Sequence, residues 1–285
     1  MPHIFVDGHV HLHPCFRLDV LLASALRNFQ VLAQEVNAAQ TAGFLLLTES
    51  AGIDVFSSLK AEPTPGQTST VADFQIKQTG EAETLVVRDA SGAELYLVAG
   101  RQIVTADRLE VLALGYDSSF PDGQPIDQVL AQLAAQASTE SAAFASSCRP
   151  LAVVPWGAGK WLGTRGQKVA QLVAQAEAHP FFLGDNGNRP FFWPLPALFK
   201  TAQSCGIRNL PGSDPMPFPG QEKKVGSFGL RLSGAIDPQA PFSSLRALLL
   251  NPASSLAPYG RCEQLYPFFK HQISMQLHKK SPSTP

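Results

Sequence analysis

The first fifty residues alternate between short apolar runs and one long amphipathic segment, and this order constrains the fold more than any other feature of the chain. Ile4-Phe5-Val6 is a short apolar run, and residues 18–40 carry leucine, alanine and valine at helical spacing. Gly43 opens a second apolar run, Phe44-Leu45-Leu46-Leu47. A strand, a helix and a second buried strand are typical of parallel α/β architecture, in which the carboxyl ends of the strands gather the functional groups.

The middle of the chain changes character before this alternation resumes. Around residues 70–115, short strand-like runs are separated by turn residues such as Ala90-Ser91-Gly92, which predicts an antiparallel β elaboration. Helical and strand patterns then alternate from residue 126 to residue 210. The sequence therefore predicts an α/β fold, a distorted TIM-like (β/α) barrel that carries the antiparallel elaboration. We expect residues 1–285 to form a single domain with a flexible tail from about residue 279.

Composition narrows the function classes. The 285 residues are 45% hydrophobic and 16% charged, with a formal net charge of -1, so the chain has ample apolar material for a core and no overall attraction to nucleic acid. The cysteines, at positions 15, 148, 205 and 262, have neither the CxxC spacing of a structural zinc site nor the density of a disulfide scaffold. No apolar run reaches the length of a membrane span, and the N-terminus lacks a signal-peptide pattern. We therefore expect a cytoplasmic protein with reduced thiols that does not bind membranes. A nucleic-acid-associated nuclease is the least favoured alternative, because it would need a local basic patch.

Three histidines follow the first apolar run within the segment Asp7-Gly8-His9-Val10-His11-Leu12-His13. In an extended chain alternate side chains share a face, so Asp7, His9, His11 and His13 can point one way while Val10 and Leu12 pack on the other. Imidazole is a common ligand of zinc and iron, and a nearby carboxylate can complete the shell. This alternation favours a metal site over the simpler alternative, a histidine-rich stretch that binds no ion.

Carboxylates follow later apolar runs and are candidates for the same site. Asp214 lies in Pro211-Gly212-Ser213-Asp214-Pro215, directly after the apolar run at Ile207, although an ordinary Asx turn would have the same sequence. Glu49 follows the second apolar run, where it is either part of the site or a solvated capping residue. Asp185 is either a member of the site or a helix cap.

Two glycine-rich basic stretches also follow predicted strands, residues 155–166 and 183–190. Their cations, Lys160, Arg165 and Arg189, are candidates to hold an anionic substrate. The GxxxxGK[ST] spacing of a P-loop is absent, so these stretches do not indicate a nucleotide site of that kind. Solvated loop cations are the alternative interpretation.

The order of these motifs resembles the polymerase and histidinol phosphatase (PHP) family of metal-dependent hydrolases. The resemblance is carried by the opening HxH of His9 and His11, the apolar strand that ends in Thr48-Glu49, and the closing Gly212-Ser213-Asp214. It implies a distorted α/β barrel that binds divalent metals and hydrolyses phosphoesters. By this resemblance His9, His11 and Asp214 are metal ligands.

The chain departs from the family pattern at four places. A histidine of the TDH motif is replaced by Ser50, the glutamate of the GxE strand by Gln102, the histidine of AHP by the segment Val154-Pro155-Trp156, and the last histidine of DxH by Met216. One metal, or two with an altered shell, is therefore expected in place of a full cluster.

These observations lead to a metal-dependent hydrolase of a small anionic substrate as the predicted function. The resemblance implies a phosphoester as that substrate, and the sequence leaves an amide or a lactone open. His9, His11 and Asp214 are predicted to hold one divalent ion, zinc in the first place and manganese or iron as alternatives. Glu49 or Asp185 is predicted to accept the proton from the attacking water, and the three cations named above are predicted to bind the substrate. The alternative is a PHP-like protein that binds a small anionic ligand without turnover. The oligomeric state is left open.

Overall fold

The computed structural model describes residues 2–38, 40–60, 69–116, 118–136, 149–177 and 179–263. The strands of these residues are β1 (His3–Val10), β2 (Thr41–Leu47), β3 (Ser69–Val71), β4 (Phe74–Gln78), β5 (Thr84–Arg88), β6 (Glu94–Val98), β7 (Gly100–Val104), β8 (Glu110–Leu114), β9 (Leu151–Pro155), β10 (Phe182–Gly184), β11 (Gly229–Ser233) and β12 (Ala257–Tyr259). The helices are α1 (Leu18–Glu35), α2 (Val55–Lys60), α3 (Ile126–Ala135), α4 (Thr164–Ala174), α5 (Ala197–Ser204), the 3-10 helix η2 (Gln221–Lys224) and α6 (Pro241–Leu250).

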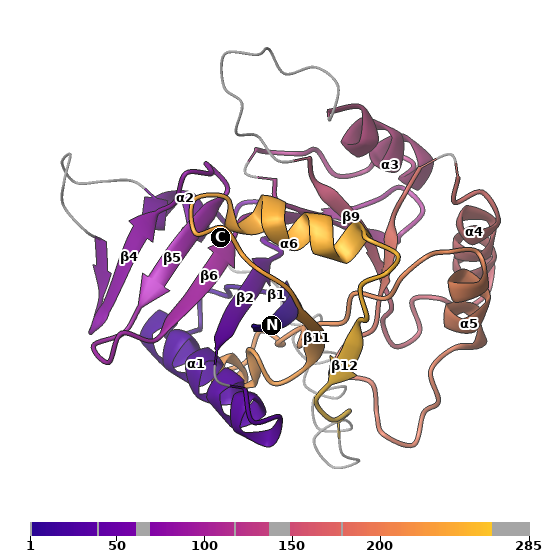
Figure 1. Ribbon diagram of the computed structural model, residues 1–285. Coiled ribbons are helices and arrows are strands. Elements are labelled where there is room, and N and C mark those ends of the chain that lie inside the picture. Colours follow the sequence, from indigo (N-terminus) through magenta and orange to yellow (C-terminus); the bar gives the residue numbers. More distant parts are fainter. Residues whose placement is uncertain are drawn as a thin grey trace.

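The larger sheet has the strand order β12-β11-β1-β2-β6-β5-β4-β3 (Figure 1). β1, β2 and β6 run parallel, and the connection between β1 and β2 is the helical crossover α1. On its other side, β1 pairs antiparallel with β11. β1 is buried on both faces from Ile4 to Val10, which explains why Ile4-Phe5-Val6 is continuously apolar.

The smaller sheet has the order β10-β9-β8-β7. β7, β8 and β9 pair antiparallel, and β9 and β10 pair parallel. Antiparallel pairing across residues 69–114 is thus divided between the two sheets, because β3 to β6 extend the larger sheet and β7 and β8 begin the smaller one.

The predicted TIM-like barrel is wrong. The described strands form one eight-stranded and one four-stranded sheet in place of a closed parallel barrel. The physical reason is that β3, β4 and β5 fold back as an antiparallel meander on β6, so the larger sheet grows outward from this edge. The antiparallel β11 on the opposite side of β1 also interrupts the parallel order.

A single extended segment, residues 207–214, connects the two sheets. Asn209 forms a parallel bridge with Leu183 of β10, and Gly212 forms one with Asn186, two residues after β10. On its other side the segment contacts β1, because the Gly8 amide donates to the Pro211 carbonyl at 3.0 Å. These isolated bonds bring residues from the far end of the chain to the carboxyl end of β1.

The interior consists of three apolar clusters. One lies between α1 and the larger sheet, and another lies between the smaller sheet and α3, α4 and α5. The third combines residues of both sheets, such as Val6 of β1 and Val153 of β9, with Phe242 of α6. Figure 1 shows α6 lying across the middle of the molecule.

Three further observations concern expectations from the sequence. No helix in the described parts of the chain is long and apolar enough to cross a membrane. Cys15, Cys205 and Cys262 are free thiols, whereas Cys148 lies outside the described residues. The tail expected from residue 279 also lies outside them.

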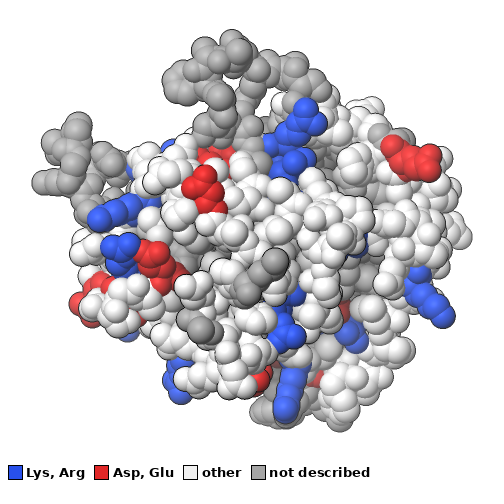
Figure 2. All heavy atoms as spheres, viewed as in Figure 1, with Lys and Arg blue, Asp and Glu red and all other residues white. Residues whose placement is uncertain are grey.

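Figure 2 shows small separate groups of both charges on the face in view, with wide uncharged areas between them.

Candidate metal centre

His9 and His11 lie at the carboxyl end of β1 and share one face, as the alternation of an extended chain predicts. Their rings are tilted at 58° with centroids 4.9 Å apart, and their Nε2 atoms are 3.0 Å apart. The two side chains are nearly inaccessible, since His9 is 4% and His11 7% exposed. Two imidazole nitrogens therefore face the same small volume from one strand.

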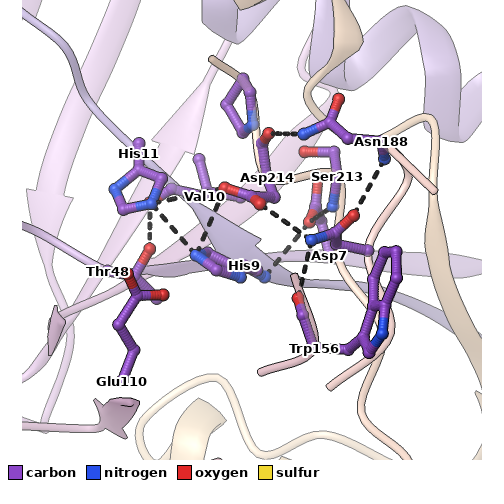
Figure 3. Close-up of polar contacts among 12 residues, drawn as sticks. Asp7, His9, Val10, His11, Thr48, Glu110, Trp156, Asn188, Ser213 and Asp214 are labelled. Atoms are coloured by element: carbon purple, nitrogen blue, oxygen red, sulfur yellow. Dashed lines mark hydrogen bonds and ion pairs between the residues drawn. The ribbon is translucent and has the colours of Figure 1, made fainter. Parts of the chain in front are cut away.

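Asp214 completes the group from the segment that lies beside β1. Its Oδ1 atom is 3.5 Å from Nε2 of His9 and 3.5 Å from Nε2 of His11 (Figure 3). Its amide donates to the His9 carbonyl at 2.9 Å, and its φ of 45° lies in the left-handed region, which turns the chain away from β1 at this residue. The Asp214 side chain is 26% exposed, so the group is open to solvent on its side.

The spacing of these three atoms fits a bound cation. Ligand atoms about 2.1 Å from a tetrahedral zinc ion lie about 3.4 Å from one another, close to the observed separations of 3.0, 3.5 and 3.5 Å. Two imidazoles and a carboxylate are also a ligand set that zinc and Fe(II) sites use. His9, His11 and Asp214 are therefore a group that could hold a metal ion.

The protonation states also suit a cation. Burial and the neighbouring His9 lower the pKa of His11 to about 3, although Asp214 acts in the opposite direction. Burial raises the pKa of Asp214, but the two histidines, Lys160 and Lys224 together outweigh this effect and hold it below the ordinary value. The group thus presents a neutral His11 imidazole and an ionised carboxylate, the forms that bind metals.

Asn186 orients the Asp214 carboxylate. Its Nδ2 atom donates to Oδ2 of Asp214 at 3.0 Å and to the Trp156 carbonyl at 2.9 Å. Because Oδ2 is engaged in this way, Oδ1 is the oxygen that faces the histidines. Asn188 donates to the main-chain carbonyl of Asp214 and accepts from Lys224 at 2.7 Å, which connects the site to η2.

Asp7 lies behind the histidines and is fully buried. Its carboxylate accepts hydrogen bonds from the amides of Ser213 at 2.7 Å, Gly226 at 2.8 Å and His9 at 3.3 Å. Through these hydrogen bonds Asp7 joins β1 to the segment that carries Asp214 and to the chain before β11. Burial raises the pKa of Asp7 to about 7, and the hydrogen bonds oppose this shift.

Glycine is required where the two segments approach most closely. A Cβ atom on Gly212 would lie 2.1 Å from the His9 amide nitrogen, and one on Gly8 would lie 2.8 Å from the Pro211 carbonyl oxygen. The absence of side chains at these positions allows the chain around Asp214 to lie directly against β1.

The two predicted proton acceptors are engaged elsewhere. Glu49 accepts hydrogen bonds from the amides of Val55 and Phe56 at the start of α2, at 2.7 and 3.0 Å, and pairs with Arg101 at 3.1 Å. Asp185 forms two hydrogen bonds with Arg189, both 2.9 Å long. These contacts are structural, and neither residue belongs to the group of ligand atoms among the described residues.

Of the three predicted substrate-binding cations, Lys160 lies nearest to the centre. It pairs with Glu110, which is 16% exposed, and its charge contributes to the pKa shifts of His11 and Asp214. Figure 3 includes Glu110 among the residues of the site. Arg165 donates to the Gly159 carbonyl at 2.8 Å, and Arg189 is held by Asp185, so both of these arginines have structural partners.

The sequence does not single out four other residues around the centre, which are Asn186, Asn188, Lys224 and Glu110. Asn186 and Asn188 lie in the glycine-rich stretch after β10, which is the one signal that could have indicated them. Glu110 begins a strand, and Lys224 lies in a short 3-10 helix. Neither position carries a motif, because their proximity to the histidines depends on tertiary packing alone.

Comparison with known proteins adds a shared fold. No protein-family model matches the sequence, and no curated protein matches it. A solved structure, described as the crystal structure of PsfC from Pseudomonas syringae PB-5123, is similar over 98% of this chain and 99% of its own, with a TM-score of 0.50 and 12% sequence identity. At 12% identity this similarity concerns the fold alone and carries no information about activity.

Proposed function

We propose that the protein is a metal-dependent hydrolase that acts on a small anionic ester, with a phosphoester as the first substrate to test. The observation that supports this proposal is the convergence of His9, His11 and Asp214, whose ligand atoms lie 3.0 to 3.5 Å apart at the end of β1. A divalent ion held there would act as a Lewis acid and lower the pKa of a coordinated water toward neutrality.

The residues of the chain orient the ligands and supply positive charge. Asn186 and Asp7 fix the carboxylate and the backbone around the centre, which is the outer support that metal ligands require. Lys160 is 41% exposed beside the site, so it can approach an anionic group that enters from solvent. Lys224 adds positive charge from η2 but is held by Asn188 and Glu263.

Zinc is the first choice of metal, with manganese and iron as alternatives. Two imidazoles and a carboxylate hold zinc in hydrolytic enzymes, and the same set with open positions binds Fe(II) in oxygenases. The ligand types therefore narrow the choice without selecting one metal.

The second candidate function is binding of a small anionic ligand without turnover. The observation that favours it is the engagement of Glu49 with α2 and Arg101 and of Asp185 with Arg189, which leaves neither predicted proton acceptor free at the centre. A binding protein would retain the metal and the anion affinity but would not release product.

Metal analysis followed by activity measurement tests both candidates. We expect the purified protein incubated with zinc and desalted to retain one ion per chain, and His9→Ala and His11→Ala to retain none. His179→Ala, which changes a histidine outside the centre, serves as the matched control and should retain the ion. If the native protein retains no stoichiometric zinc, manganese or iron, both candidates are rejected.

Turnover separates the two candidates. The measurement is the release of inorganic phosphate from a panel of phosphomonoesters. Release that requires the metal and is lost in His11→Ala would support the hydrolase. Tight binding of the same compounds without release of phosphate would support the binding protein.

A further inference from the structure

An apolar pocket adjoins the candidate metal centre. It has a volume of about 400 Å³ and lies between the segment that follows His11, residues 12–21, and residues 52–55, which follow β2. This volume is within the range of pockets that bind small molecules. Both segments follow the carboxyl ends of parallel strands, the end of the sheet that carries His9 and His11.

His13 connects the pocket to the metal centre. Its ring lines the pocket and stacks on the ring of His11, with centroids 5.1 Å apart and an interplanar angle of 25°. Phe16, another lining residue, packs edge to face on the His13 ring, with ring centroids 5.1 Å apart. A hydrogen bond of 3.0 Å between His13 Nε2 and the Pro215 carbonyl, next to Asp214, fixes this ring. One imidazole ring therefore separates the pocket from a ligand of the centre.

The walls of the pocket are mostly hydrocarbon. Leu12, Phe16, Leu18, Ile53 and Val55 supply apolar side chains. The carboxylate in the lining, Asp54, is turned toward Arg101 at 3.0 Å. Such walls favour an apolar group and provide little to bind a free anion inside the pocket.

The loop that forms one wall is held by hydrogen bonds. Arg101 donates to the Ile53 carbonyl at 2.6 Å and to Asp54, and it pairs with Glu49. Glu49 in turn accepts the amide of Val55 at 2.7 Å. Because the protein's own hydrogen bonds hold this wall, binding there requires little additional loss of conformational entropy.

We propose that this pocket binds the apolar part of the substrate, whose anionic group is held at the metal centre. The substrate class is then an organic phosphate that carries an alkyl chain or a single aromatic ring. Glu49 and Arg101 are positioning residues that hold the pocket wall. This inference rests on the proposed function, because the anionic group needs the centre formed by His9, His11 and Asp214.

The test is a series of alkylphosphonates titrated into zinc-loaded protein by isothermal calorimetry. Phosphonates are suitable because their carbon-phosphorus bond is not hydrolysed, so the binding of anion and chain is measured without turnover. We expect the Kd to fall by about two- to fourfold for each methylene from methyl- to hexylphosphonate, as burial of each methylene in an apolar pocket predicts. A Kd that does not change with chain length would overturn the proposal.

Ile53 is the residue to change, since it lines the pocket, is partly exposed and is outside the three buried clusters. We expect Ile53→Asp to reduce the gain in affinity to less than about twofold over the whole series, whereas Ile53→Leu retains it. Val104→Asp, at a 43% exposed valine at the end of β7, is the matched control and should behave like the native protein. Equal chain-length dependence in native protein and Ile53→Asp would overturn the assignment of this pocket. Thermal unfolding verifies that each variant is folded, and if Ile53→Asp is not, Ile53→Ser replaces it.

Failure of the pocket and failure of the metal centre give different results. In one outcome, methylphosphonate binds and this binding is lost in His11→Ala, but longer alkyl chains do not lower the Kd. This outcome would reject the pocket and would still support the proposed function. If no phosphonate binds, the proposed function is rejected together with the substrate class. Titration of hexanol then examines the pocket alone, with Ile53-dependent binding supporting an apolar site and no binding rejecting it.

Discussion

At the scale of single residues, the geometry of the centre depends on groups that do not themselves face the metal position. Asp214 has two carboxylate oxygens, and the hydrogen bond from Asn186 to Oδ2 selects Oδ1 as the one that faces His9 and His11. Outer-shell hydrogen bonds of this kind orient metal ligands and reduce the conformational cost of metal binding.

The first prediction concerns this hydrogen bond. We expect Asn186→Ala to weaken zinc binding by about 10- to 100-fold, because Asp214 loses the partner that orients it. Competition with a chromophoric chelator measures the affinity. Asn251→Ala, which changes an exposed asparagine after α6, is the matched control and should leave the affinity unchanged. Equal zinc affinities of Asn186→Ala and the native protein would show that Asn186 does not position the ligand.

The second prediction concerns the pH dependence of Glu49. Burial raises its pKa above the ordinary value of 4.5, and this effect outweighs the amides of Phe56 and Val55 and the charge of Arg101. The folded protein therefore holds the proton more tightly than the unfolded chain, so the stability contribution is complete below the unfolded pKa and is lost as the pH rises through the folded pKa.

We accordingly expect the free energy of unfolding of the native protein to fall, relative to that of Glu49→Gln, as the pH rises above 4.5. Urea unfolding at several pH values measures the difference. Gln34→Asn, at the exposed end of α1, changes no ionisable group and is the control, so its difference from the native protein should not vary with pH. A difference that grows in favour of the native protein with rising pH would contradict the raised pKa.

At the scale of elements, the segment at residues 207–214 forms the site. It forms bridges beside β10 through Asn209 and Gly212, and it contacts β1 through Pro211 and Asp214. One of its partners, β10, precedes the segment by about 25 residues, whereas the other, β1, precedes it by about two hundred residues. The close approach that Gly212 permits is what places Asp214 over the histidines.

The third prediction follows from this close approach. We expect Gly212→Ala to reduce the free energy of unfolding by about 1–3 kcal/mol and to weaken zinc binding, since the new Cβ would overlap the backbone of β1 at His9. Chemical denaturation and zinc titration measure the two effects. Gly184→Ala in β10 is the matched control, because its Cβ would lie 3.1 Å from a Val153 side-chain atom and 3.3 to 3.4 Å from the Pro155 and Leu210 backbone, and so would disturb the segment less. If Gly212→Ala leaves both quantities unchanged, the segment does not contact β1 in the way described.

At the scale of the whole molecule, the centre lies where the two sheets meet. His9 and His11 come from the larger sheet, and Asp214 is supported by Asn186, which follows β10 of the smaller sheet. A metal that binds these ligands therefore connects distant parts of the chain, and its binding free energy contributes to the stability of the folded protein.

The fourth prediction concerns this coupling. We expect zinc at about 100 times its Kd to stabilise the protein by about 2.7 kcal/mol and to raise its Tm by roughly 5 °C. Removal of the ion with a chelator should reverse the shift, and His11→Ala should show none. Differential scanning calorimetry with and without metal measures it. An equal shift in His11→Ala would assign the stabilisation to a different site.

Local patterns in the sequence were sufficient for the first part of the fold and for the two candidate ligands on β1 and directly after it, His9 and His11. The apolar runs of β1 and β2 and the spacing of α1 are determined by neighbouring residues, and so is the common face of His9 and His11. The pairing of distant strands is not local. The same apolar runs are compatible with a closed barrel or with two sheets. The antiparallel pairing of β4 with β5 and of β11 with β1 excludes the closed parallel barrel.

The roles of the other polar residues also depended on tertiary structure. Glu49 and Asp185 follow strands as catalytic carboxylates often do, but the nearest cations, Arg101 and Arg189, hold them in structural pairs. The sequence alone determined that two histidines share a face at the end of a strand, because the two-residue period of an extended chain requires it. Only the tertiary structure decided that Asp214 and Asn186 lie beside them, because contacts across about two hundred residues are set by the packing of the two sheets.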